Sequence, residues 1–193
     1  MARKKPTPAP PRGGRLDAQA WVEAALDALA LGGVEAVRVE PLAKALAVTK
    51  GSFYWHFAER RALLDALFKH WAEGRIAAIR QHAAGSEPPA DVLMRLADLY
   101  TRHANIKGLT IELAIRSFAR TDAKAAKGVR AVDTERLIHV AKLFAGLGWG
   151  SDDAQARAVL FYSYLFGQSL LDTSVVDAQA RDSAIKRLLT PPR

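Results

Sequence analysis

The sequence predicts an all-α protein of about nine helices, and three observations carry that prediction. Apolar residues recur at helical spacing through most of the 193 residues, and glycine or proline clusters separate the periodic segments. No segment alternates apolar and polar residues as a half-buried strand does. The chain is predicted to divide into a lead-in at residues 1–15, a small helical domain at 16–61 and a larger helical domain at 62–193.

The composition limits the class of protein. Half of the residues are hydrophobic, but charged residues interrupt every apolar run before it reaches the ~18 residues that a membrane-spanning helix needs. The sequence contains no cysteine, which excludes disulfides, zinc–cysteine sites and thiol catalysis. The N-terminus lacks the apolar segment of a secretory signal. We therefore expect a soluble, cytoplasmic protein without a membrane partner.

Positive charge is concentrated at the N-terminus. The chain carries 28 Lys and Arg against 20 Asp and Glu, a net charge of +8. Residues 1–15 combine basic residues with prolines and a Gly-Gly pair and contain no acid, whereas residues 16–61 are nearly neutral. This composition predicts a flexible basic arm. Contact with a phosphate backbone and simple solvation are equally good interpretations of such an arm.

The first helix is predicted to begin at Asp17 and to stop at Gly32-Gly33. Aspartate is a preferred N-cap residue, and apolar residues recur at helical spacing from Val22 to Leu29. The glycine pair is typical of a helix C-terminus.

Two short helices follow, separated by a tight turn. Pro41 suits the first turn of a helix that runs to Leu46, since a proline there loses no helical hydrogen bond. Thr49 can cap a third helix that runs to about Phe57. Apolar residues of the two helices can pack across the turn at Ala47-Val48, which predicts a helix-turn-helix.

The outward face of the third helix combines cationic, small and aromatic residues. Its members are Lys50, Gly51, Ser52, Tyr54, Trp55 and His56. Adjacent exposed aromatic side chains are unfavourable on a monomer surface unless something covers them, and a DNA groove would do so. An ordinary amphipathic helix pair is the alternative, but the turn, the cap and the exposed face together favour DNA binding.

Residues Val48–Phe57 (VTKGSFYWHF), followed by Arg61–Leu67 (RALLDAL), resemble the signature of the TetR family of transcriptional regulators. The resemblance covers roughly residues 17–71. It implies a homodimeric repressor whose third helix enters the major groove of a palindromic operator in double-stranded DNA. It also implies that the C-terminal helical domain dimerises and binds a small-molecule effector, which would release the protein from its operator.

The resemblance also assigns contacts with DNA. Ser52 and Tyr54 fall where the family contacts bases and nearby phosphates. The remaining predicted contacts, at the start of the third helix or with phosphates, are Arg38, Thr49, Lys50, Gly51, Trp55, His56 and Arg61.

Two residues depart from the family pattern. Ala47 stands where many members have glycine, so the turn must accommodate a Cβ atom. Glu40 stands where the family pattern has a basic base-reading residue. Its carboxylate could accept a hydrogen bond from cytosine N4 or stabilise the N-terminus of the second helix, and the sequence alone favours helix stabilisation.

The rest of the chain continues the helical pattern. Helices are predicted from Arg60 past Trp71, from Val92 to His103, over Ile111–Phe118 after a break at Lys107-Gly108, over about 123–147, and at 152–173 and 178–189. The middle helices carry aromatic and histidine residues that could line an effector cavity, although any single one is more typical of plain core. These are Tyr100, His103, Phe118, His139, Phe144 and Trp149.

Small and large residues alternate between residues 154 and 171. Small residues let helices approach closely, so this segment and the last helix could form a four-helix bundle between two subunits, the interface that the resemblance implies. A buried hairpin within one chain is the alternative. The predicted interface residues are Ala158, Phe161, Tyr162, Leu165, Gly167 and Leu170.

The sequence shows no sign of an enzyme. Its histidines form no i, i+4 pair, and no glycine-rich phosphate loop, nucleophile elbow or dinucleotide fingerprint is present. We therefore expect no catalytic residue, metal or cofactor. A second class of function is an architectural DNA-binding protein without an effector, in which the basic arm makes contacts independent of DNA sequence.

Overall fold

The computed structural model describes residues 17–101 and 105–189, and every regular element in them is a helix. The helices are α1 (Ala18–Ala36), α2 (Val39–Ala45), α3 (Lys50–Tyr54), α4 (Arg60–Ala83), α5 (Pro89–Thr101), α6 (Ile106–Phe118), α7 (Ala123–Gly146), α8 (Ser151–Gly167) and α9 (Ala178–Leu189). Nine helices in the described residues confirm the predicted all-α fold. The predicted arm at 1–15 and His103 lie outside the described residues.

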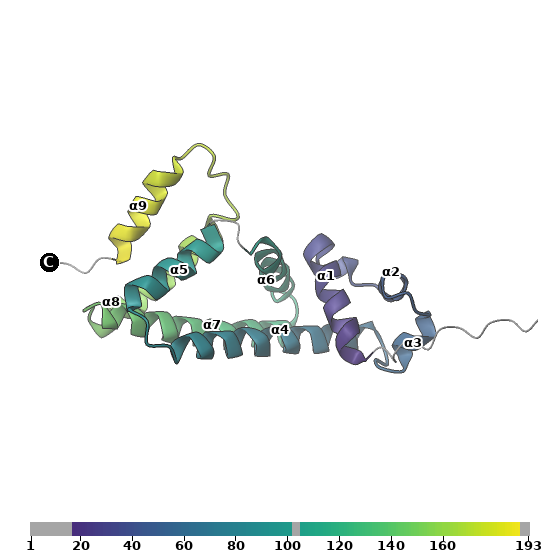
Figure 1. Cartoon of the computed structure of the whole chain (residues 1–193). Helices are drawn as coiled ribbons and strands as arrows, with labels where there is room; N and C mark the ends of the chain where they lie inside the picture. Colours follow the sequence, from purple (N-terminus) through teal and green to yellow (C-terminus); the bar gives the residue numbers. More distant parts are fainter. Residues whose placement is uncertain (1–16, 102–104, 190–193) are drawn as a thin grey trace, which may run out of the picture.

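The molecule is elongated, with its two ends built from different helices (Figure 1). Helices α1, α2 and α3 form one end, and α5, α8 and α9 lie toward the other. The long helices α4 and α7 pack against each other between these ends, and α6 packs on α1. Within the two described ranges, no helix is both long and apolar enough to span a membrane.

Helix α1 begins at the predicted cap and kinks at the predicted stop. The Asp17 side chain accepts a hydrogen bond from the Ala20 N–H at 2.9 Å. Gly33 has φ 67°, so the helical path is interrupted there, and one further turn follows to Ala36. Arg60 then donates hydrogen bonds to two carbonyls beyond the kink, those of Val34 and Val37, at 2.5 and 2.6 Å. The guanidinium group thereby satisfies backbone acceptors that a helix end leaves open.

Several helix boundaries differ from the prediction, and those of α3, α6 and α8 have clear outcomes. Helix α3 ends at Tyr54 instead of Phe57, because the next N–H groups both turn back to the Phe53 carbonyl. Helix α6 begins at Ile106, since the Asn105 side chain caps the N–H of Gly108 at 3.0 Å, and the predicted break at 107–108 is instead its first turn. Helix α8 ends at Gly167 instead of residue 173.

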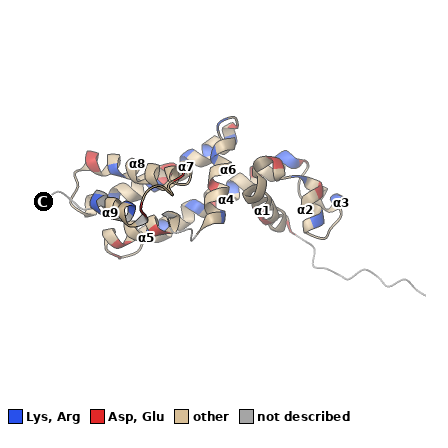
Figure 2. Cartoon of the chain, turned by 90° about the horizontal axis from the view of Figure 1, so that it is seen from above, with Lys and Arg blue, Asp and Glu red and all other residues tan. Residues whose placement is uncertain are grey.

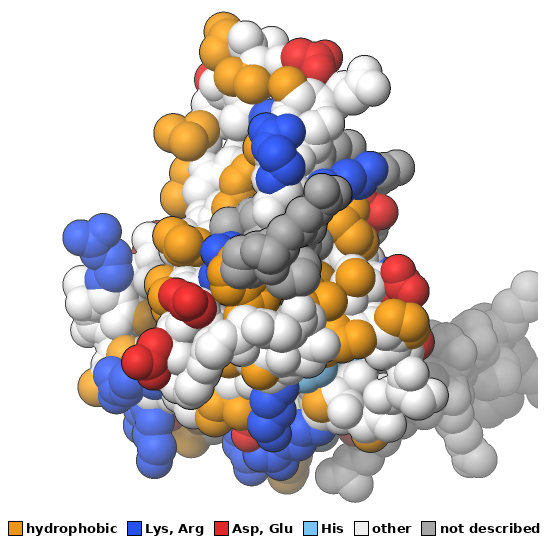
Figure 3. Space-filling view, turned by 90° about the vertical axis from the view of Figure 1, so that its left-hand side faces the viewer, with side chains coloured by type: hydrophobic (Ala, Val, Ile, Leu, Met, Phe, Trp, Pro, Cys, Tyr) orange, Lys and Arg blue, Asp and Glu red, His pale blue; other side chains and the backbone are white. Residues whose placement is uncertain are grey.

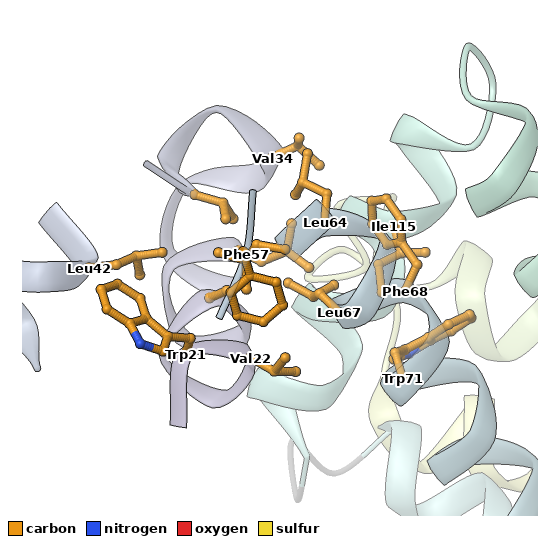
Figure 4. Packing of buried hydrophobic residues seen from close by; sticks show 14 of the residues in the cluster. Trp21, Val22, Val34, Leu42, Phe57, Leu64, Leu67, Phe68, Trp71 and Ile115 are labelled. Carbon is orange, nitrogen blue, oxygen red and sulfur yellow. The ribbon is translucent and has the colours of Figure 1, made fainter. Parts of the chain in front are cut away.

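The first hydrophobic core joins the N-terminal helices to α4, α6 and α7 (Figure 4). Trp21 of α1 and Phe53 of α3 meet edge to face with ring centroids 5.3 Å apart. Phe68 of α4, Ile115 of α6 and Val132 of α7 belong to the same cluster. The core therefore crosses the predicted domain boundary after residue 61.

The second hydrophobic core lies at the opposite end, among α5, α7, α8 and α9. Leu93, Phe144, Phe161 and Ile185 contribute to it, and the rings of Phe144 and Phe161 meet edge to face at 6.2 Å. Figure 3 views the molecule from this end, where hydrophobic side chains also remain at the surface.

Burial in the second core corrects the predicted dimer interface. Ala158, Phe161 and Leu165 have no exposed surface, and Tyr162 is 8% exposed. These four side chains pack inside one chain, as in the alternative of a buried hairpin, so we no longer propose them as partner contacts. The alternation of small and large residues did not distinguish this buried face of α8 from the exposed one.

The two other predicted interface residues lie at the end of α8 and after it. Gly167 closes the helix, and a Cβ atom there would meet no atom within 4 Å. Leu170 follows α8 and is 71% exposed. Both remain predictions for contact with a partner.

Candidate nucleic-acid interface

Helices α2 and α3 form a compact pair held by buried apolar residues. Leu42 and Ala43 of α2 and Phe53 of α3 are buried in the first core. The connecting turn places Ala47 at φ 55°, in the left-handed region, and the Val48 N–H returns to the Ala43 carbonyl at 2.9 Å. The turn thus accommodates the Cβ of Ala47 in a conformation that costs alanine about 1 kcal/mol relative to glycine.

The outward side of this pair gathers the residues predicted to contact DNA. Tyr54 is 54% exposed and Trp55 is 81% exposed, although Trp55 follows the last residue of α3. A shallow depression beside them is lined by Thr49, Gly51, Ser52, Trp55 and His56. Thr49 is the N-cap residue of α3, but its side chain makes no capping hydrogen bond. Exposed aromatic side chains rimmed by polar groups are typical of a surface that binds a partner.

An ion pair that sequence reasoning missed connects the two helices on this surface. Lys50 donates a hydrogen bond from Nζ to Glu40 Oε1 at 2.5 Å. This bond lowers the pKa of the Glu40 carboxyl and raises that of the Lys50 ammonium. Arg38, the residue before α2, is exposed at the same end and adds a further positive charge.

Comparison with known proteins identifies the family of this chain. Residues 22–67 match the model of the bacterial regulatory proteins of the tetR family. The class A tetracycline repressor protein from transposon 1721 of Escherichia coli is 30% identical over 166 residues, which are 86% of this chain and 71% of that protein. The chain belongs to the TetR family.

Solved structures agree with the TetR fold. A transcriptional regulator from Rhodococcus sp. Rha1 is similar with a TM-score of 0.72 and 18% identity, over 90% of this chain and 94% of that one. FadR from Bacillus subtilis, solved in complex with stearoyl-CoA, is similar with a TM-score of 0.62 and 15% identity, over 89% and 97% of the two chains. The predicted family and its function as a DNA-binding transcriptional regulator are thereby confirmed, with α2 and α3 as the helix-turn-helix.

Arg61 of this TetR chain, to which the resemblance assigns a phosphate contact, is paired with two carboxylates. Its Nε donates to Asp65 at 2.8 Å, and its two terminal nitrogens both bond to Asp122, the N-cap residue of α7. A phosphate would therefore have to compete with two carboxylates for this guanidinium. In the structure Arg61 ties the start of α4 to the start of α7.

A buried polar network that the sequence analysis did not find connects α6 with α7. Glu112 is 1% exposed and accepts hydrogen bonds from both terminal nitrogens of Arg136, at 2.7 and 2.8 Å, and from Arg116 at 2.9 Å. Arg116 also donates to Asp133 at 2.9 Å. Burial alone would raise the pKa of Glu112, but the bond from Arg136 and the nearby arginine charges outweigh it, and the pKa is lowered. The i, i+4 spacing of Glu112 and Arg116 was the available sequence signal.

The residues predicted to line an effector cavity are distributed over several places. Tyr100 lines a cavity of about 820 Å³ between α5, α6 and the chain after α8. Phe118 stacks on Phe68 in the first core, whereas Phe144 is buried in the second. His139 lines a separate pocket of about 330 Å³, and the ring of Trp149 lies 3.2 Å below the guanidinium of Arg157.

The stability of this TetR chain should depend on pH through His139. Burial lowers the pKa of His139, and the nearby positive groups His82 and Lys142 act in the same direction. The unfolded chain then binds a proton at higher pH than the folded chain, so the free energy of unfolding falls as the pH drops below about 6.5. We expect the melting temperature of His139→Gln to fall less between pH 7.5 and 5.5 than that of the wild type. His70→Gln, at an exposed position on α4, is the matched control and should follow the wild type.

Proposed function

We propose that this protein is a dimeric repressor that binds a palindromic operator through α3 and leaves it when a small molecule binds to the C-terminal helices. The observation that carries the DNA-binding part is the exposed Tyr54–Trp55 pair next to Lys50 at the end of the molecule. A symmetric dimer would place two such surfaces about 34 Å apart, one turn of DNA. In this proposal residues 16–61 bind DNA, and residues 62–193 bind the effector and the partner subunit.

A second copy of the chain is the proposed occupant of the outer face of α7 and α8. Ile138 and Val159 are each 51% exposed there, and Leu160 is 56% exposed. A groove of about 600 Å³ runs between the two helices, with Leu137 and Ala141 among its lining residues. These exposed residues replace the buried residues of the first interface prediction. Two copies of an α7–α8 pair would form the four-helix bundle.

The cavity beside Tyr100 is the proposed effector site. Its volume of about 820 Å³ lies within the ~300–1,000 Å³ of typical ligand pockets. Leu109 and Leu113 supply apolar lining, and Gln168 and Arg181 supply polar groups. A small molecule with both apolar and polar parts would match this lining, as the complex of FadR with stearoyl-CoA illustrates for a protein of the same fold.

Helix α6 offers a route from this cavity to the DNA-binding end. Leu109 and Leu113 of α6 line the cavity, while Ile111 and Ile115 of the same helix are buried in the first core with residues of α1. A ligand that shifts α6 would therefore disturb the packing that holds α1. A coupling free energy of about 1–3 kcal/mol between the two sites is enough to change operator occupancy substantially.

Selection of bound sequences from random DNA tests the proposal, and two substitutions locate the contact surface. Lys50→Ala and Tyr54→Ala should each weaken binding to the selected operator by about tenfold or more while leaving the circular dichroism melt unchanged, because both side chains are exposed. Lys69→Ala, which removes an exposed lysine of α4, is the matched control and should bind as the wild type does.

Two outcomes would contradict the proposal. Full affinity in both the Lys50 and the Tyr54 variants at moderate salt would remove α3 from the interface. Equal binding of all sequences by the wild type would favour the architectural DNA-binding protein over a repressor.

A further inference from the structure

Two residues that line the cavity beside Tyr100 carry buried hydrogen-bond donors without a partner in the described part of the chain. The donor atoms are Nε2 of Gln168 and Nε of Arg181. Gln168 is the C-cap residue of α8, whereas Arg181 belongs to α9, which lies beside α5 and carries basic positions (Figure 2). Buried donors in native proteins almost always have a hydrogen-bond partner. Two such donors around one cavity indicate that the cavity receives an acceptor.

The charged groups of the cavity leave the guanidinium of Arg181 without a counterion. Within the described residues Arg181 forms no ion pair, and one of its terminal nitrogens donates to the hydroxyl of Thr173 at 2.7 Å. The lining also includes the carboxylates of Asp172 and Asp177. Both aspartates are exposed, and each already accepts a backbone N–H, at 3.0 and 2.8 Å respectively. The buried unsatisfied atoms are therefore donors, and the acidic groups are in contact with solvent.

The rest of the lining is mostly aliphatic, so a ligand would bury hydrocarbon next to the two donors. The aliphatic residues are Leu99, Ile106, Leu109, Leu113, Leu171 and Val176. A carboxylate or carbonyl oxygen can accept from an amide N–H and a guanidinium N–H, and hydrogen bonds from a charged donor are about twice as strong as neutral ones. An ammonium group offers only donors, and the charge of Arg181 would repel it.

We propose that the effector is an apolar molecule with a carboxylate or carbonyl group whose oxygen accepts hydrogen bonds from Gln168 Nε2 and Arg181 Nε. The inference rests on the proposed function and deepens it, because it names the class of molecule that the effector site selects. A ligand bound to both residues would also tie α9 to the end of α8. A cationic amine, held by Asp172 and Asp177, is the opposite class of ligand.

Isothermal titration calorimetry of the full chain with matched probes tests the selection. Decanoate, methyl decanoate and decylamine share one hydrocarbon frame, and the carboxylate, methyl ester and methylamine of naphthalene share another. On at least one frame the acid or the ester should bind at least tenfold more tightly than the amine, because only they can accept from both donors. Tighter binding of the acid than of the ester would show that the charge of Arg181 contributes.

Two substitutions remove the donors, and each has a matched control. Gln168→Glu is nearly isosteric and replaces the amide donor with an acceptor, whereas Arg181→Met removes the guanidinium. Each should weaken binding of the preferred probe by about 10- to 100-fold, and Gln168→Glu should no longer disfavour the amine. Gln81→Glu on α4 and Arg187→Met on α9 change exposed residues that do not line the cavity, and both should bind as the wild type does. If Arg181→Met melts earlier than the wild type, Gln168→Glu decides.

The outcomes separate this inference from the proposed function. No binding of any probe at millimolar concentration, tighter binding of the amines, or equal affinity in the wild type and Gln168→Glu would overturn the inference. Release of operator DNA is measured separately, by fluorescence anisotropy of the labelled duplex. A probe that binds through Gln168 and Arg181 but releases no DNA would support the inference and contradict the effector part of the proposed function.

Discussion

Glu112→Ala is expected to lower the free energy of unfolding by about 3–5 kcal/mol, because it leaves a buried guanidinium without its main partner. Arg136 is 3% exposed and gives both of its terminal nitrogens to the Glu112 carboxylate. Asp133 lies 3.8 Å from Arg136, too far to replace these bonds. Denaturant unfolding monitored by circular dichroism measures the change.

Two further variants separate buried charge from ion pairing in general. Glu135→Ala breaks the pair between Arg80 and Glu135, whose side chains are 68% and 29% exposed, and should cost less than about 1 kcal/mol. The double variant Glu112→Leu with Arg136→Met removes both buried charges and should recover much of the loss. A Glu112→Ala protein as stable as Glu135→Ala would show that water reaches Arg136.

The buried network of Glu112 and Arg136 should also make the free energy of unfolding depend on pH in the acidic range. Because the pKa of Glu112 is lowered in the folded chain, its contribution to the free energy of unfolding is present above the pKa of the unfolded chain and is lost as the pH falls through the folded value. The Glu112 and Arg136 double variant should therefore lose less stability than the wild type as the pH falls below about 4.3.

Val159→Lys is expected to convert the proposed dimer into monomers. Val159 lines the groove between α7 and α8, which Lys142 also lines, so a second lysine there adds like charge to the proposed symmetric interface. A monomer holds one α3 and loses the effective concentration that links two half-sites, which is worth about 10²–10⁴ in affinity for the palindrome. Sedimentation reports the mass, and gel-shift titration reports the affinity.

Val175 offers the control for this substitution. It is 85% exposed, and it lies between α8 and α9, away from the groove. Val175→Lys should remain dimeric and bind the palindrome as the wild type does. A folded Val159→Lys protein that is still dimeric and still binds tightly would place the interface on another surface.

Local sequence signals predicted the helices well because they depend on neighbouring residues. The cap at Asp17, the proline in the first turn of α2 and the start of α4 are each set within a few positions of the chain. The end of α3 was missed, since the contacts that turn the chain back to the Phe53 carbonyl leave no pattern in composition. The cap by Asn105 was overlooked because the glycine at 108 was interpreted as a break.

The residue types of the candidate nucleic-acid interface could be predicted from the sequence, but the ion pairs that these residues form could not. The aromatic residues of the short helix were expected from the sequence to be exposed, and Tyr54 and Trp55 are exposed in the structure. The partner of Arg61 is 61 positions away at Asp122, and periodicity carries no information on such a contact. The sequence also did not indicate which face of α8 is buried within the chain, because a helix with small and large residues on all sides can be buried on any of them.

The first core has a consequence for how the protein is made. Trp21 and Phe53 share that core with Ile115 and Val132, so the DNA-binding helices cannot finish packing when residue 61 has been synthesised. Ribosomes add about 5–20 residues per second, so translating residues 62–132 takes roughly another 4–14 s. During that interval α1 lacks the helices α4 and α6 that pack on it in the finished chain. A nascent chain of this kind exposes apolar surface, and with it a tendency to aggregate, until the first turns of α7 join the core.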